Sequence, residues 1–382
     1  MAELNFPANP QSGDTYDFGN VRYRYDGIKW TSIATNDKNI AQVVSDAVSG
    51  LVNENLTINS SGSIVQFGPA INNGHWICDM WMMGGIGGIA DSVFTAQRLN
   101  DISQYARGSH QYLAMAFTNA VTLNNTHAPN MSLKVPRHLS TPLFGKTFTV
   151  SFWAAATKSG TYSATIRSRN SALCYVHPYT LVANTWTKIT FTVKDGLPTA
   201  NATDPLYWGD SNALSYSLTF CSGYVGSDYI TSTPDAWSVG SNKLGVAAQS
   251  NNSSMLAVGD SMKITSVKVE LGETATPHIP RNPMVELAMC KQYYEEVRFA
   301  DTGMTSTALS STSPWYKRFE YTMKAAVPTI TTKGTPVLSN ITAISYVGID
   351  QYGARLAYTW TSGPNIYSYD VAAIVDARSI LL

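Results

Sequence analysis

Four stretches of the chain alternate apolar and polar residues with a period of two, which is typical of strands that bury one face. These stretches span residues 146–153, 188–193, 214–220 and 262–269. Segments rich in turn residues separate them, and no run of helical patterns intervenes. The pattern predicts an antiparallel β-sandwich of jelly-roll type over residues 64–280, with one face of each sheet exposed to water.

A shorter pattern occupies the first 35 residues. Residues 21–25 alternate with period two and lead through Asp26-Gly27 to Lys29-Trp30, which predicts a β-hairpin. A single hairpin is at best marginally stable in water. Residues 1–35 are therefore expected to dock on their own copies or on another protein.

Residues 36–54 carry an apolar stripe at spacings of four, three and four, formed by Ile40, Val44, Ala47 and Leu51. These are the spacings of coiled-coil a and d positions, but two heptads are too few to hold a coiled coil alone. Either a short trimeric bundle or a helix packed on its own domain fits, and the position between two β-rich units favours the bundle. Residues 55–63, rich in Asn and Ser, are expected as a linker, so residues 36–63 form a helical neck and linker.

The last segment, residues 281–382, begins with a predicted helix. Asn282 can cap it, and Pro283 suits the first helical position. Strand patterns return at 317–323 and 354–361, which predicts a C-terminal β domain. The apolar end, residues 367–382, is expected to be packed, with neighbouring subunits as one candidate surface.

Composition narrows the classes of partner. Charged residues make up only 14% of the chain and the net charge is zero, so no positive field attracts nucleic acid or an anionic membrane. Tyr and Trp are plentiful, which suits neutral polar ligands and self-association. No apolar run is long enough for a spanning helix, and the N-terminus lacks the pattern of a signal peptide. The four scattered cysteines fit a reducing compartment.

The sequence offers no strong sign of catalysis, a cofactor or a metal. Residues 85–90 match G-x-G-x-x-A, but they lack the strand–loop–helix context of a dinucleotide site. The six histidines are scattered and form no metal-ligand pair. Carboxylates for glycoside hydrolysis can be named but not distinguished from turn formers. We therefore expect a binding protein, not an enzyme.

Aromatic residues outside the strand patterns are the binding candidates, because rings can stack on the C–H faces of sugars while carboxylates bind their hydroxyls. The candidate ligand-binding residues are Tyr207, Trp208, Asp210, Tyr229, Asp235 and Trp237. The alternative is that these rings cap the sandwich or are buried between subunits. The sequence leaves both open.

Three segments resemble tail-fibre proteins of tailed bacteriophages, and they occur in the same order. Residues 5–30, with Gly13-Asp14 and Asp26-Gly27, resemble a short motif near the N-terminus of phage tail proteins. Residues 143–154, Asn184-Thr185-Trp186 and residues 267–277 resemble a jelly-roll module similar to carbohydrate-binding modules. Residues 286–294 and 323–328 resemble the start of the C-terminal domain of such fibres.

The resemblance implies a mainly β homotrimer with its N-terminus at the virion. The residues expected to anchor it there, on a tail, baseplate or adaptor protein, are Phe6, Pro7, Tyr25 and Trp30. The outward half would attach to a host-surface polysaccharide after assembly in the host cytoplasm. A purely structural tail or head component is the alternative, and a glycan-depolymerising tailspike is a weaker one.

Overall fold

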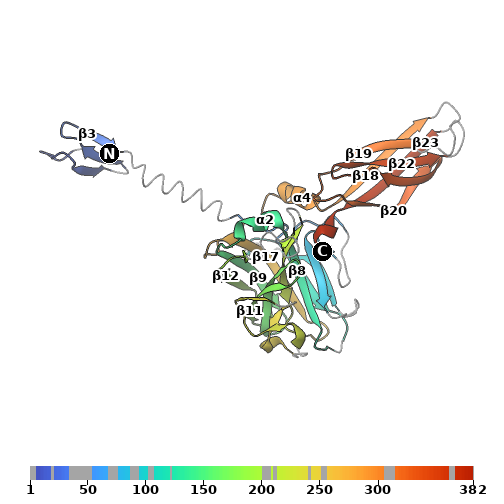
Figure 1. Ribbon diagram of the computed structural model, residues 1–382, viewed down its shortest axis with the longest axis horizontal. Coiled ribbons are helices and arrows are strands. Elements are labelled where there is room, and N and C mark those ends of the chain that lie inside the picture. Colours follow the sequence, from blue (N-terminus) through green and yellow to red (C-terminus); the bar gives the residue numbers. More distant parts are fainter. Residues whose placement is uncertain are drawn as a thin grey trace. The chain divides into compact units, whose positions relative to one another are not determined.

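The computed structural model divides the chain into two compact units, residues 1–54 and 55–382 (Figure 1). The residues that the structure describes are 6–18, 21–33, 54–67, 76–86, 94–101, 107–120, 123–199, 208–209, 213–239, 242–250, 256–304, 315–360 and 366–381. The described residues are mainly in strands, as predicted. Among the described helices, none has the length and apolar character needed to cross a membrane.

The first unit holds a three-stranded antiparallel sheet in the order β1-β2-β3. Its strands are β1 (Thr15–Phe18), β2 (Val21–Tyr25) and β3 (Trp30–Ile33). The predicted hairpin is confirmed as β2–β3, and its turn is fixed by Asp26, whose carboxylate accepts from the backbone N–H groups of Ile28 and Lys29 at 2.9 Å. These bonds lower the pKa of Asp26. Strand β1 was not predicted from the sequence.

An aromatic cluster packs one face of this sheet. Phe6 stacks on Trp30 with centroids 5.0 Å apart, and it meets Tyr16 and Tyr23 edge-on at 5.6 and 5.0 Å. Tyr25 lies 5.4 Å from Trp30. Each ring stays partly exposed, because so small a sheet cannot enclose them. The predicted neck residues, Ile40, Val44, Ala47 and Leu51, lie outside the described residues.

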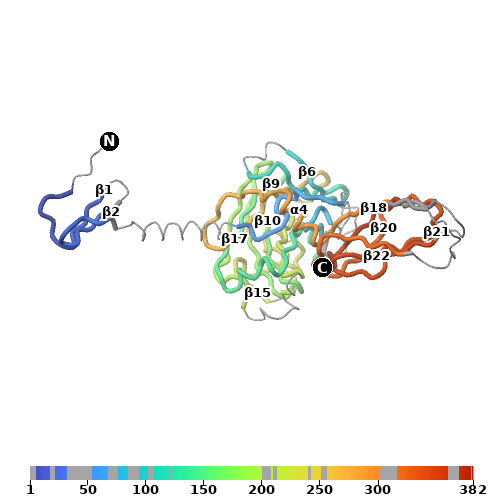
Figure 2. The backbone as a smooth tube through the Cα atoms, turned by 90° about the horizontal axis from the view of Figure 1, so that it is seen from above, coloured from blue at the N-terminus to red at the C-terminus, as the bar shows by residue number. Residues whose placement is uncertain are grey.

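The second unit contains an antiparallel β-sandwich whose two sheets appear in Figures 1 and 2. The larger sheet runs in the order β15 (Trp237–Val239), β11 (Leu173–Leu181), β10 (Gly160–Ser168), β13 (Leu214–Cys221), β8 (Ala128–Pro136), β5 (Trp81–Ile86), β4 (Trp76–Cys78). The smaller sheet runs in the order β12 (Thr187–Val193), β9 (Phe148–Ala156), β17 (Ser261–Leu271), β7 (Gln111–Phe117), β6 (Phe94–Asn100). All four predicted strands of this region are present.

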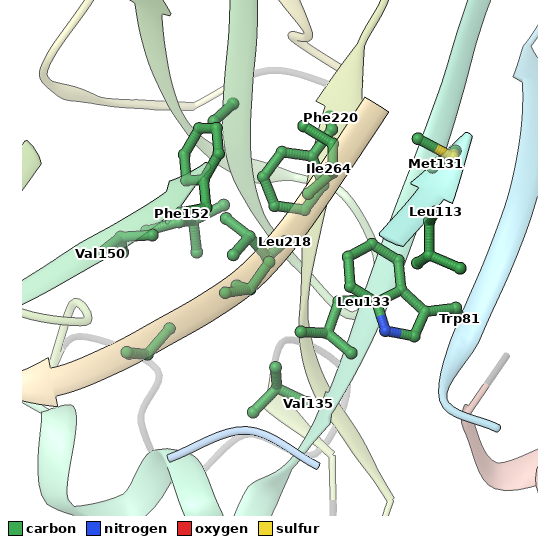
Figure 3. Close-up of a cluster of buried hydrophobic side chains, with 14 of the residues drawn as sticks. Trp81, Leu113, Met131, Leu133, Val135, Val150, Phe152, Leu218, Phe220 and Ile264 are labelled. Atoms are coloured by element: carbon green, nitrogen blue, oxygen red, sulfur yellow. The ribbon is translucent and has the colours of Figure 1, made fainter. Parts of the chain in front are cut away.

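The core lies between these two sheets (Figure 3). Inward residues of both sheets are fully or almost fully buried there, for example Trp81, Leu218 and Phe220 of the larger sheet and Phe152 and Ile264 of the smaller. Trp81 and Phe220 stack with centroids 5.7 Å apart. The alternation read from the sequence therefore marks the inward faces correctly.

Two expectations for the sandwich need correction. Residues 55–63, expected as a linker, are packed against it: Ile58 is fully buried, and the carbonyl of buried Asn59 accepts from Trp81 Nε1 at 2.8 Å. Strand β13 is buried on both faces, not one. Part of the outer face of this sheet is covered because Ser163 and Thr165 of β10 donate to the carbonyl of Leu244 at 2.6 and 3.0 Å.

The C-terminal part begins with α4 (Pro283–Lys291), where Asn282 accepts from the N–H of Met284 at 2.9 Å as the predicted cap. Two three-stranded sheets follow. Their strands, in sheet order, are β18 (Tyr294–Met304), β23 (Ile366–Asp376) and β20 (Thr329–Ser339), then β19 (Trp315–Glu320), β22 (Gly353–Trp360) and β21 (Ile341–Val347). The C-terminal end is packed within its own chain, since Leu381 joins the sandwich core.

A layer of polar and aromatic contacts joins this part to the sandwich. The Arg378 guanidinium lies over the rings of Phe67, Trp76 and Tyr294, at 4.7, 5.0 and 4.2 Å from their centroids. Such cation–π contacts gain strength when they are desolvated. They hold the last turn of the chain against the start of the sandwich.

Candidate functional site

The outer face of the five-stranded sheet carries three partly exposed aromatic side chains, Trp153, Trp186 and Tyr112, which together form an aromatic platform. On β9, Phe152 points into the core, so Trp153 points outward. Its cross-strand partners are Lys188 on β12 and Thr265 on β17. The other outward residues of β9, Thr149, Ser151 and Ala155, are small, so Trp153 is the only large side chain on this face of the strand.

Two more rings and a guanidinium complete the platform. The Arg107 guanidinium lies 5.4 Å from the ring centroids of both Trp153 and Trp186. Tyr112 meets Trp186 edge-on at 5.8 Å, and the ammonium of Lys263 lies 5.6 Å from the Tyr112 ring. Burial, with a smaller effect from the charge of Asp101, raises the pKa of Tyr112, so its hydroxyl remains protonated at neutral pH.

Two hollows flank the platform. The larger has a volume of about 320 Å³ and is lined by Arg107, Gly108, Ser151, Phe152, Trp153, Lys188, Ser266, Pro277 and His278. The smaller has a volume of about 110 Å³ and is lined by Ala155, Ala156, Thr157, Asn184, Trp186 and Lys263. The larger volume lies within the usual range for small-molecule sites.

Local backbone irregularity shapes the larger hollow. The register of β17 shifts between Thr265 and Lys268, and Ser266 within this bulge has φ +53°. Bulges of this kind bend a strand and redirect side chains beside functional sites. Gly108 faces the bulge with φ +85°, and a Cβ there would lie 2.7 Å from the carbonyl oxygen of His278. A glycine is therefore required at this position.

Pro277 and His278 form another wall of the larger hollow, in a segment held by a buried ion pair. Lys268 Nζ and Glu270 Oε2 are 3.0 Å apart, and both side chains are almost fully buried. Glu270 accepts from the backbone N–H of Thr276 at 2.8 Å and from its hydroxyl at 2.6 Å. Since Pro277 and His278 follow directly, these bonds fix the rim of the hollow.

His278 is held neutral within this wall. Its Nδ1 lies 3.3 Å from the carbonyl of Gly108, which can only accept, so Nδ1 carries the proton. Its Nε2 then accepts from the hydroxyl of Ser60 at 2.9 Å. Burial, outweighing the bond to Gly108 and aided by the charges of Lys268 and Arg281, lowers the pKa of His278 to about 4.

This arrangement can bind a ring-shaped polar ligand. Indole and phenol faces can pack against the apolar C–H face of a sugar, while Arg107, Lys188 and the Ser151 hydroxyl offer hydrogen bonds at its edge. The described residues that line the two hollows include no carboxylate. The described part of the chain also contains no cluster of three His, Cys, Asp or Glu side chains suited to a metal ion.

The residues predicted from sequence lie elsewhere. Trp208 is completely buried, with its ring 5.3 Å from that of Phe144 and 6.1 Å from that of Trp237. It is a core residue and presents no face to a ligand, which corrects its assignment as a binding residue. Trp237 is partly buried, and its Nε1 donates to the carbonyl of Gly196 at 2.8 Å. Tyr207 and Asp210 lie outside the described residues.

The remaining two candidates are not brought together. Asp235 is half exposed, and its Oδ1 lies 2.6 Å from His177 Nδ1 beside β11. Tyr229, in the 3-10 helix Ser227–Tyr229, packs on a separate cluster that contains Leu244. No described contact joins Tyr229 to Asp235 or Trp237. The predicted residues therefore form no common site among those described.

Sequence reasoning missed Trp153, Trp186, Tyr112 and Arg107 as site residues. The signal for Trp153 was present, because Phe152 and Trp153 adjoin within an alternating strand and only one can face the core. Nothing in the sequence indicated that Arg107 would lie over the rings of both Trp153 and Trp186, which are far from it along the chain.

No protein-family model and no curated protein matches the sequence. Two solved structures are similar to part of this chain, both with TM-scores below 0.3. The enzymatically active domain of tailspike protein 4 from bacteriophage CBA120 has a TM-score of 0.29 at 16% identity, covering 57% of this chain and 21% of its own. A family 11 carbohydrate-binding module from Clostridium thermocellum, solved with a tetrasaccharide, has a TM-score of 0.27 at 9% identity, covering 50% of this chain and 88% of its own. This chain spans about a fifth of the tailspike domain. Similarity at this level does not identify the ligand of this chain.

Proposed function

We propose that this chain binds a glycan on the aromatic outer face of the five-stranded sheet. The observation that carries the proposal is the platform of Trp153, Trp186 and Tyr112 beside a hollow of about 320 Å³. Large, partly exposed rings gathered on one face of a sheet form the kind of patch that supports an interaction. Rings beside hydroxyl and cationic donors match the mixed apolar and polar faces of a sugar.

The wider proposal is a bacteriophage tail fibre that attaches to a host-surface polysaccharide. It rests on the ordered resemblance in the sequence and on two exposed surfaces. The aromatic cluster of Phe6, Tyr25 and Trp30 would dock on a tail, baseplate or adaptor protein. Exposed apolar side chains of the C-terminal part, Tyr316, Met323, Val327, Val337 and Tyr352, would meet copies of the chain in a homotrimer. Three weak sites per fibre then act together through a high effective concentration.

The proposal is one of binding without hydrolysis. Most glycosidases place two carboxylates about 5 to 9.5 Å apart across the scissile bond. The described residues that line the larger hollow offer cations and hydroxyls instead. Incubation of the protein with host polysaccharide should leave the chain length of the polysaccharide unchanged.

The test is binding of the full chain to a glycan array and to host-surface polysaccharide. Trp153→Ala and Trp186→Ala should each weaken binding roughly tenfold, because a stacked ring contributes about 1.4 kcal/mol. Val239→Ala removes an exposed apolar side chain of β15, in the other sheet of the sandwich, and is the control. Unchanged binding by both tryptophan variants would overturn the proposed site.

A purely structural fibre or head component is the second candidate, favoured by the exposed apolar residues of the C-terminal part. Native mass spectrometry and the array separate the two functions. A trimer that retains no glycan would support the structural role, while retention that depends on Trp153 would exclude it as the whole function.

A further inference from the structure

Two cationic side chains share one row on the outer face of the seven-stranded sheet. Lys134 of β8 pairs with Ser217 of β13, and Ser217 pairs in turn with Arg167 of β10. Their sequence neighbours Leu133, Leu218 and Ile166 are fully buried in the core, so the row itself points away from it. This row lies on the opposite sheet from the aromatic platform.

The row has a gap at its centre. Neighbouring strands lie about 4.8 Å apart, so the backbones of the two cationic residues are separated by roughly 10 Å. Between them Ser217 is short, and Lys134 Nζ reaches its hydroxyl at 3.3 Å. Two further hydroxyls adjoin on the same face, Ser132 and Thr219, whose oxygens are 3.0 Å apart.

The two charges have no counter-ion in the described part of the chain. Neither Lys134 nor Arg167 forms an ion pair with any described carboxylate, and Nε and Nη1 of Arg167 are buried without a hydrogen-bond partner. The nearby thiols supply no negative charge, because burial raises the pKa of Cys221 to about 12 and also raises that of Cys174. Burial, and then the charge of Arg167, lowers the pKa of Lys134 to about 7.

Part of this face is open to solvent. The segment that contains Leu244 covers Ser163 and Thr165 of β10, and Arg167 is the next outward residue along that strand. Lys134 and Arg167 each remain partly exposed. A small ligand can therefore reach the row at the edge of the covering segment.

We propose that Lys134, Arg167 and the hydroxyl of Ser217 form a binding site for an oxyanion, such as a phosphate group or a carboxylate. A desolvated guanidinium without a counter-ion is costly, and protonation of Lys134 beside it adds to that cost; a bound anion offsets both and favours the protonated amine. The planar guanidinium can donate a charge-assisted hydrogen bond to such a group, and the ammonium and hydroxyl supply donors from the other side. The site is independent of the proposed glycan platform.

Chemical labelling of the full chain tests the site without mutation. An amine whose pKa is near 7 is largely unprotonated at pH 7.5, so acetic anhydride should acylate Lys134 readily, as read by mass spectrometry. Millimolar inorganic phosphate, and in a second arm glucuronate, should slow acylation at least fivefold relative to chloride at equal ionic strength. Lys146, an exposed residue of the same sandwich, should show no protection.

Calorimetric titration gives the equilibrium counterpart. Arg167→Gln should weaken phosphate binding at least tenfold, Arg167→Lys less, and Lys146→Gln not at all. Protection by phosphate alone identifies a phosphate site, and protection by glucuronate identifies a site that accepts an acidic sugar; either supports the proposal. Equal acylation with and without both anions, or undiminished binding by Arg167→Gln, would overturn it. Loss of glycan binding by Trp153→Ala has no bearing on this result.

Discussion

Acidification should destabilise the protein through His278. This side chain is neutral in the fold, and burial depresses its pKa from 6.5 to about 4. Between these two values the unfolded chain binds more protons than the folded one, so stability is fully present above pH 6.5 and falls as the pH drops toward 4. At 1.36 kcal/mol per pKa unit, the shift corresponds to about 3 kcal/mol lost across this window.

The measurement is urea unfolding of the wild type and of His278→Gln at intervals from pH 4 to 7.5. A glutamine can keep one hydrogen bond in the pocket but cannot titrate, so the variant should lose stability at neutral pH and show a flatter pH dependence by about 3 kcal/mol. His138→Gln, at an exposed histidine, is the control and should keep the slope of the wild type. Equal slopes for the wild type and His278→Gln would refute the reasoning.

Two further predictions concern buried charge and backbone geometry. Glu295→Gln leaves the fully buried ammonium of Lys324 without its partner at 2.9 Å. The substitution should lower the free energy of unfolding by about 3–5 kcal/mol in urea titrations and should speed amide hydrogen exchange in β18. A loss of about 1 kcal/mol or less would contradict the prediction. Gly196→Ala places a Cβ 2.4 Å from a backbone nitrogen, whereas Gly334→Ala, at a similar φ, meets nothing within 4 Å. Both variants strain the backbone, because both glycines have a positive φ, but only Gly196→Ala also creates a clash. Gly196→Ala should therefore lower the urea midpoint of unfolding more than Gly334→Ala does. Equal decreases of the midpoint for the two variants would contradict this prediction.

Much of the strand content could be predicted because the period of two reports on burial at each position. The strands that contain Phe152, Phe191, Phe220 and Ile264 were all recovered, as was the helix capped by Asn282. Strand β1 was missed because its four residues are too few to establish a period. Residues 55–63 were misread because Asn and Ser are typical of linkers, while here the carbonyl of Asn59 is satisfied by Trp81.

The candidate site was less accessible to sequence reasoning. Strand β9 pairs with β12 and with β17, which lies more than 100 residues further along the chain. No local pattern encodes which distant strands become neighbours, so the meeting of Arg107, Trp153 and Trp186 depends on sheet topology. Trp208 was misassigned for the same reason. It lies in a segment without a strand pattern, yet its ring is buried in the core, where it packs against Phe144 and Trp237.

The sequence by itself determined that the chain is mainly β, where most strands lie and which face of each strand is apolar, because these depend on neighbouring residues along the chain. Tertiary structure alone decided which aromatic rings are buried and which form the platform. It also decided that Lys134 and Arg167 share one row across β13 without a described counter-ion. These properties depend on strand order and on the segments that cover each sheet, and both arise from contacts between distant parts of the chain.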